Sequence, residues 1–225
     1  MEELPRRRSG RWSFSVRSLA AVIVLIALFL GFIARPWRER RDAITYIEEQ
    51  GGFIAFGYQF RDGSYDSYDS RASAPSIWQP DDLFRRWMHA DIVHVSLSNV
   101  QRGSKVLKYV ERLDSVQDLA LRGYEFTDEV ITPLAGLQRL ERVGFYDTSV
   151  TDGGLKTLSR LPRLRSIDLE NAPVSDAGLA ALVNLTHLEF LGVRGTNVTA
   201  AGRQWISERI PGLKIEFGPR RRVHP

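Results

Sequence analysis

Two consecutive stretches decide the fold: LERVGFYDTSVTDGGLKTLSRLPR, residues 140–163, and LRSIDLENAPVSDAGLAALVNLTH, residues 164–187. When one is shifted by 24 residues onto the other, the apolar residues coincide at positions 0, 3 and 5 of each stretch. They coincide again at positions 15, 18 and 21, and both stretches share a V-[TS]-D-x-G-L segment. Agreement at so many positions indicates an internal repeat.

The same period continues on both sides of this pair. Five residues occupy position 0: Ile92, Val116, Leu140, Leu164 and Leu188. Apolar residues follow each of them three and five places later. We therefore predict about five 24-residue repeats over residues 91–217. The fifth copy lacks the Asp and has Arg203 at an apolar position, as expected of a terminal repeat that must present a polar face to water.

The spacing within each repeat predicts one strand and one helix. In the opening L-x-x-L-x-L segment, alternate residues of a short strand point to one side. Positions 15, 18 and 21 lie on one face of a helix. One strand and one helix cannot bury both apolar faces alone, so neighbouring repeats must stack into an α/β solenoid. Thr151 and Ser175 are predicted N-caps, and the Asp that follows each of them favours the positive end of a helix dipole.

The 24-residue period with its V-[TS]-D-x-G-L segment resembles leucine-rich repeats, in the subtype also found in F-box-type substrate adaptors. The whole layout resembles bacterial membrane-anchored leucine-rich-repeat proteins. In those proteins a segment like Arg11–Leu19 precedes one membrane helix, and a segment like Ala43–Gly52 follows it. The resemblance implies a right-handed α/β horseshoe arc that binds a partner, and it carries no catalytic residues.

An uncharged apolar stretch occupies residues 18–34, with Arg17 and Arg35 at its ends. We predict a basic tail over residues 1–17 and a transmembrane anchor over residues 18–37. A cleaved signal peptide is the main alternative, but no small-x-small pair closes the stretch. Five arginines precede it and four follow it closely, so the positive-inside rule barely decides the orientation. We expect most of the chain to lie outside the cytoplasm.

Residues 38–90 are predicted to form an N-terminal cap on the first repeat. Arg38–Gln50 is expected to form a helix that Gly51 and Gly52 end, and Phe53–Phe60 a strand. Residues 61–80 are rich in Ser, Asp and Tyr and are expected to form a loop, followed by a short helix from Pro80 to Met88. Residues 218–225 are a basic C-terminal tail.

Composition excludes several functions. The chain of 225 residues has no cysteine, which excludes disulfides and thiolate metal sites. Its formal charge is +4, yet residues 91–217 carry 15 Lys and Arg against 16 Asp and Glu, which argues against a nucleic-acid-binding face. The four histidines lack metal-ligand spacing, and neither a Gly-x-Ser-x-Gly elbow nor a phosphate-binding loop is present. We therefore expect no enzyme activity, cofactor, metal or small-molecule substrate.

The sharper prediction concerns the concave side of the solenoid. Positions 2, 4 and 6 of each repeat point away from the core. The candidate protein-binding residues there are His94, Asp118, Arg122, Arg142, Tyr146, Asp168, Glu170, Phe190 and Arg194. Arginine and exposed aromatic residues are enriched in binding hot spots. A solvated face with charges paired across strands is an equally good interpretation. The predicted function is protein recognition at a membrane; the alternative is a structural, envelope-organising scaffold that self-associates.

Overall fold

The structure, a computed structural model, describes residues 16–56, 92–98, 100 and 103–219. The chain divides into two compact units, Met1–Arg38 and Glu39–Pro225. The boundary falls within the first helix, α1 (Val16–Glu49). In the second unit the strands are β1 (Phe53–Phe56), β2 (Ile92–Ser98), β3 (Asp118–Arg122), β4 (Arg142–Tyr146), β5 (Ser166–Asp168), β6 (Phe190–Gly192) and β7 (Lys214–Glu216). The helical segments are α3 (Gly103–Val110), η4 (Thr132–Gly136), α4 (Asp152–Leu158), α5 (Asp176–Leu179), η5 (Ala180–Leu182) and α6 (Ala200–Arg209).

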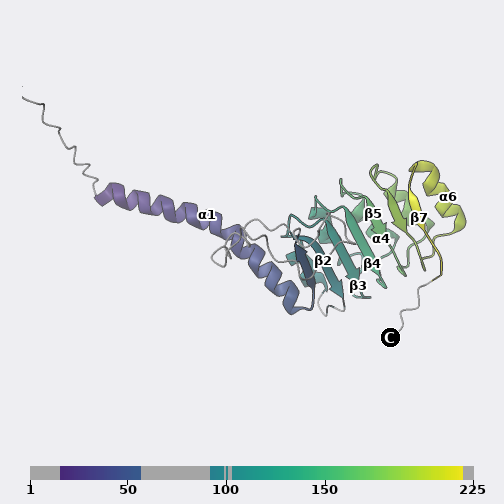
Figure 1. Cartoon of the computed structure of the whole chain (residues 1–225), viewed down its shortest axis with the longest axis horizontal. Coiled ribbons are helices and arrows are strands. Elements are labelled where there is room, and N and C mark those ends of the chain that lie inside the picture. The colour runs from purple at the N-terminus through teal and green to yellow at the C-terminus, as the bar shows by residue number, and fades with distance from the viewer. Residues whose placement is uncertain (1–15, 57–91, 99, 101–102, 220–225) are drawn as a thin grey trace, which may run out of the picture. The chain divides into compact units, whose positions relative to one another are not determined.

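The seven strands form one sheet in chain order, from β1 to β7 (Figure 1). β1 pairs with β2 in the antiparallel sense, and every later neighbour is parallel. Each parallel step pairs residues 24 apart, as in the row Val95, Leu119, Val143, Ile167, Leu191 and Ile215. The predicted period is therefore the strand register, and the α/β repeat architecture is confirmed.

The core follows the predicted positions. Position 0 of the five predicted repeats is at most 3% exposed, and positions 3 and 5 are buried in the same way. The apolar residues at positions 15, 18 and 21 of the first four repeats lie in the helical segments or next to them, and all are buried: Leu107, Val110, Leu113, Ile131, Leu134, Leu137, Leu155, Leu158, Leu161, Leu179, Leu182 and Leu185. Each repeat thus buries one side of its strand against its own helical segment and against its neighbours.

The repeats differ from the prediction in two ways. The second repeat has the 3-10 helix η4 in place of an α-helix; Pro133 at its start has no backbone N–H to donate. A sixth repeat strand, β7, continues the register after the five predicted strands. This strand was not predicted from the sequence, because Gly212 occupies position 0 and charged residues flank Ile215.

Three links between consecutive repeats are each made by a carboxylate near the start of a helical segment. Asp152 accepts hydrogen bonds from the backbone N–H of Ser175 at 2.7 Å and from its hydroxyl at 2.6 Å. Asp128 binds Thr151, and Asp176 binds Thr199, in the same way. The donating residues Thr151, Ser175 and Thr199 are also the N-caps of their own helices, as predicted for Thr151 and Ser175. The Asp predicted to interact with its own helix thus also connects its repeat to the next one.

The glycine of the V-[TS]-D-x-G-L segment makes room for this link. A Cβ at Gly178 would lie 2.4 Å from Oδ1 of Asp152, and a Cβ at Gly154 would lie 2.6 Å from Oδ1 of Asp128. At Gly202 the same Cβ would lie 1.9 Å from Oδ1 of Asp176. The Asp of one repeat and the Gly of the next are therefore one structural unit.

The N-terminal end of the core is covered by Glu39–Glu49, the part of α1 in the second unit, and by β1. Ala43 and Ile47 are fully buried, and Tyr46 stacks on Tyr109 with ring centroids 4.3 Å apart. The predicted helix over residues 38–50 is present, and the predicted strand is present over Phe53–Phe56. Residues 57–60, the predicted loop over 61–80 and the predicted helix over 80–88 lie outside the described residues.

In the first unit, residues 16–38 are helical, and several large apolar side chains are exposed, among them Ile23, Leu25 and Leu28. Across the described residues, no helix combines the length and the apolar composition needed to cross a membrane. The transmembrane helix predicted over residues 18–37 is therefore not supported by the structure.

Candidate protein-binding face

The side of the sheet opposite the buried leucines, predicted above to be concave, is called the open face here. The strand register arranges its side chains in three rows. The first row contains His94, Asp118, Arg142, Ser166, Phe190 and Lys214. The second contains Ser96, Ala120, Gly144, Asp168, Gly192 and Glu216, and the third contains Ser98, Arg122 and Tyr146. Glu170 and Arg194 follow the ends of β5 and β6.

Three predicted residues of the first row form one polar network. Nδ1 of His94 lies 3.1 Å from Oδ1 of Asp118, and Nε of Arg142 donates to the other carboxylate oxygen at 2.6 Å. His94 and Asp118 are buried, while the side chain of Arg142 is 39% exposed. Asp118 therefore bridges a buried imidazole and a half-exposed guanidinium on three neighbouring strands.

Burial controls the protonation of this network. Burial, with the charge of Arg142 as a second cause, lowers the pKa of His94 to about 4. His94 is therefore neutral near pH 7, and its Nδ1–H donates to Asp118. Burial also raises the pKa of Asp118 to about 6, although its hydrogen bond and ion pair with Arg142 act in the opposite direction. We infer that Asp118 is ionised at neutral pH, because the short contact with Arg142 favours the carboxylate.

Arg122 and Tyr146 form the second group of predicted residues. Nη1 of Arg122 donates to Oδ2 of Asp147 at 3.0 Å, and the guanidinium carbon lies 5.2 Å from the centre of the Tyr146 ring. Nδ2 of Asn171 donates to the other oxygen of Asp147 at 2.8 Å. The Arg122 side chain is 42% exposed, so it is fixed on both sides yet accessible.

Two glycines shape the middle of the open face. A Cβ at Gly144 would lie 2.5–2.7 Å from the Tyr146 ring, which therefore folds back along its own strand. A Cβ at Gly192 would lie 2.4 Å from Oδ1 of Asp168. Burial, together with the charges of Asp168, Asp118 and Glu170, raises the pKa of Tyr146 to about 12. The Tyr146 hydroxyl therefore remains protonated at neutral pH beside these carboxylates.

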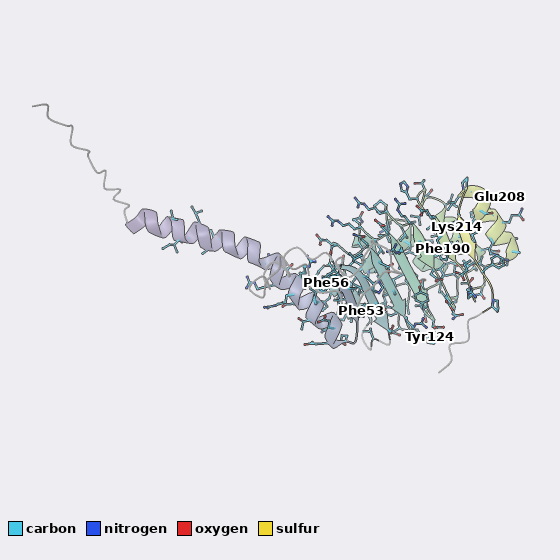
Figure 2. All side chains as sticks on the ribbon, in the orientation of Figure 1. Phe53, Phe56, Tyr124, Phe190, Glu208 and Lys214 are labelled. Atoms are coloured by element: carbon cyan, nitrogen blue, oxygen red, sulfur yellow. The ribbon has the colours of Figure 1, made fainter. Side chains whose placement is uncertain are left out.

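The last two predicted residues, Phe190 and Arg194, lie in or next to β6. Arg194 donates to Oε1 of Glu216 on β7. Phe190 is half-buried and not the exposed aromatic that was predicted. Figure 2 shows Phe190 towards one end of the sheet and Phe53, 6.1 Å from the His94 ring, towards the other. Cross-strand charge pairing, the structural interpretation of this face, is present at all three of its predicted arginines.

Asp147, which binds Arg122, and Asn171, which binds Asp147, were not predicted from the sequence. Asp147 and Asn171 have positive φ angles of 54° and 63°. They occupy one repeat position with Gly123 and Gly195, whose φ angles are 130° and 66°. Gly, Asn and Asp are the residues that tolerate this left-handed conformation, so their recurrence every 24 residues was the available signal.

The described residues contain no group of three or more His, Asp or Glu side chains arranged to hold a metal ion. The polar groups of the open face instead form ion pairs and hydrogen bonds on a surface that offers arginine, tyrosine and carboxylate side chains. This arrangement suits recognition of another macromolecule.

Comparison with known proteins gives structural relatives only. No model of a known protein family matches the chain, and no curated protein matches it. Its structural neighbours are bacterial leucine-rich-repeat proteins. An internalin of Listeria monocytogenes is 17% identical over 58% of this chain and 43% of its own length, with a TM-score of 0.39. Internalin C2 of the same species is 21% identical over 49% and 55%, with a TM-score of 0.37.

A leucine-rich-repeat protein of Leptospira interrogans is 14% identical over 49% of this chain and 33% of its own length, with a TM-score of 0.34. The chain therefore spans between a third and somewhat more than half of these proteins. All three TM-scores lie below 0.5, so the description of the fold rests on the register and burial given above.

Proposed function

We propose that this chain is a protein-binding module that recognises its partner through the open face of the sheet. The observation that carries the proposal is the state of Arg122. Its guanidinium is fixed by Asp147 at 3.0 Å and by the Tyr146 ring at 5.2 Å, while much of the side chain remains exposed. A side chain ordered before binding loses less conformational entropy when a partner arrives.

The neighbouring carboxylates add a complementary feature. Asp168 and Glu170 lie close enough to Tyr146 to raise the pKa of its hydroxyl. A partner would therefore meet a fixed cation, an aromatic ring and carboxylates within a few strands. Such mixed patches contribute to specificity, because a partner of the wrong charge pattern leaves buried charges unpaired.

We also propose that the chain is not an enzyme. The His94–Asp118 contact resembles two members of a hydrolase triad. However, Asp118 is shared with Arg142 at 2.6 Å, and the lowered pKa of His94 makes it a poor general base near neutral pH. We assign this network a structural role, since it fixes three neighbouring strands in the first row of the open face.

The test is affinity capture with mass spectrometry on the full chain in mild detergent. The variant combines Arg122→Glu with Glu170→Lys, which leaves the net charge unchanged. Its matched control combines Arg163→Glu with Glu129→Lys, two exposed positions outside the three rows. We expect a partner that the original chain and the control retain and that the variant loses, with all three chains giving the same circular dichroism spectrum. Equal capture by variant and control would rule out the open face as the binding surface.

A membrane anchor over residues 18–37, with most of the chain outside the cytoplasm, is a further part of the proposal. Its support is the uncharged stretch over residues 18–34 and the exposure of apolar side chains such as Leu25 and Leu28. The test is alkaline carbonate extraction of membranes that contain the full chain. We expect the chain to stay with the membrane and a Leu25→Arg, Leu28→Arg variant to be released. Release of both chains would contradict an anchor.

A further inference from the structure

The two ends of the repeat core are covered to different degrees. At the N-terminal end, Ile92, Val95 and Leu97 are fully buried beneath β1 and the end of α1. At the C-terminal end, Ile215 and Trp205 are half-buried, and Phe217 is 58% exposed. The guanidinium of Arg203 lies 4.2 Å from the Phe217 ring centre and covers only part of it. A repeat array needs a polar cap at each end, and this end still presents apolar side chains.

The same end has an open strand edge. β7 is the last strand of the sheet, and within the described residues no strand pairs with its outer side. The backbone N–H of Lys214 bonds to the carbonyl of Glu189, and the carbonyl of Glu216 accepts from Val193, so both residues direct their backbone groups towards β6. Because these directions alternate along a strand, Ile215 directs its N–H and carbonyl outwards. An edge of this kind can add a strand from another chain.

The side chains of β7 are complementary to themselves. If two copies of β7 pair in the antiparallel sense about Ile215, Lys214 of each copy stands opposite Glu216 of the other. Both pairs then lie on the open face, where Lys214 is exposed and the Glu216 side chain is 41% exposed. On the core side, Phe217 of each copy stands opposite Leu213 of the other, so its ring gains an apolar neighbour and loses contact with water. A two-fold axis produces these contacts twice from one set of residues.

We propose that the chain forms a two-fold dimer by antiparallel pairing of β7 with β7 of a second copy, which joins two seven-stranded sheets into one. The pairing caps the apolar C-terminal end and satisfies the outward backbone groups of Ile215. It is independent of partner binding, because strand addition takes place in the plane of the sheet and leaves Arg122 and Tyr146 accessible. The paired segment is short, so the dimer is weak and its fraction rises with protein concentration.

The experiment uses sedimentation velocity on the full chain in one fixed detergent, at concentrations up to about 100 µM. We expect a monomer–dimer equilibrium. Lys214→Glu places like charges opposite each other and weakens dimerisation at least about tenfold, as does Glu216→Lys. A mixture of these two variants restores dimerisation, because each strand then carries the charges that the other lacks. Lys156→Glu, an exposed charge reversal on α4, is the control and leaves the equilibrium unchanged.

Ile215→Pro gives a second, independent variant, because it removes the outward N–H and leaves the inward bonds of Lys214 and Glu216 in place. It also avoids the loss of the Arg194–Glu216 pair. We expect it to be monomeric with an unchanged circular dichroism spectrum. A chain that stays monomeric throughout the concentration range overturns the proposal. So does a dimer that persists in the folded single variants, or a mixture that associates no better than its components.

Discussion

The link between Asp152 and Ser175 gives the most direct test of how the repeats hold together. Asp152→Ala removes two charge-assisted hydrogen bonds, of 2.7 and 2.6 Å, and leaves the N–H of Ser175 without its acceptor. Hydrogen bonds to charged groups contribute about 1.5–3 kcal/mol each when buried, and this pair is only partly buried. We expect the free energy of unfolding to fall by about 2–3 kcal/mol in total. The midpoint of thermal unfolding should fall by roughly 4–12 °C.

The assay is urea unfolding followed by far-ultraviolet circular dichroism. The matched control is Asp114→Ala, an exposed aspartate for which a change within about 0.5 kcal/mol is expected. Asp152 also lies in the first turn of α4, so part of its effect could come from the helix dipole. A double-mutant cycle with Ser175→Ala separates the two contributions, because only the link between repeats couples these residues. If Asp152→Ala behaves like the control, or if the cycle gives no coupling energy, the link does not stabilise the solenoid.

Three further predictions follow from the same geometry. Gly178→Ala should lower the free energy of unfolding in urea by about 1–3 kcal/mol, because its Cβ would lie 2.4 Å from Oδ1 of Asp152. The loss should be much smaller in an Asp152→Ala background, and equal losses in both backgrounds would contradict this explanation. Hydrogen bonds from Thr199 lower the pKa of Asp176, so Thr199→Ala should raise this pKa towards the usual 3.8 in a carboxyl NMR titration. An unchanged pKa would show that the Thr199 hydroxyl does not contribute to the lowering. Because His94 has a lowered pKa of about 4 against an ordinary 6.5, the unfolded chain binds the extra proton between these values, and stability falls as the pH drops through this range. The raised pKa of Asp118 changes stability in the opposite direction between about pH 4 and 6. The measurement is therefore the difference in free energy of unfolding between the chain and a His94→Gln variant, which should become smaller from pH 6.5 to pH 4. A constant difference would mean that the pKa of His94 is not lowered.

The sequence predicts which residues share the open face, but not how deeply each of them is buried. The alternation of a strand determined that His94, Asp118 and Arg142 share a side, and the 24-residue period determined that they are neighbours. Their interaction could not be anticipated, because it depends on how deeply the first row is buried. Phe190 shows the same limit: its side of the strand was predicted correctly, and its exposure was not.

The repeat length, the strand register, the apolar core and the N-caps Thr151 and Ser175 could all be predicted from the order of the residues. These features are local or periodic, so residue type and spacing are sufficient to specify them. Three features became apparent only in the folded chain: Asp152 joins one repeat to the next, β7 extends the sheet, and Asp147 binds Arg122. The two contacts connect residues about 24 positions apart, and the sequence of β7 matches the repeat pattern only weakly. The physical reason is that stacking brings such groups together, and the direction of each side chain is then fixed by packing and not by the period.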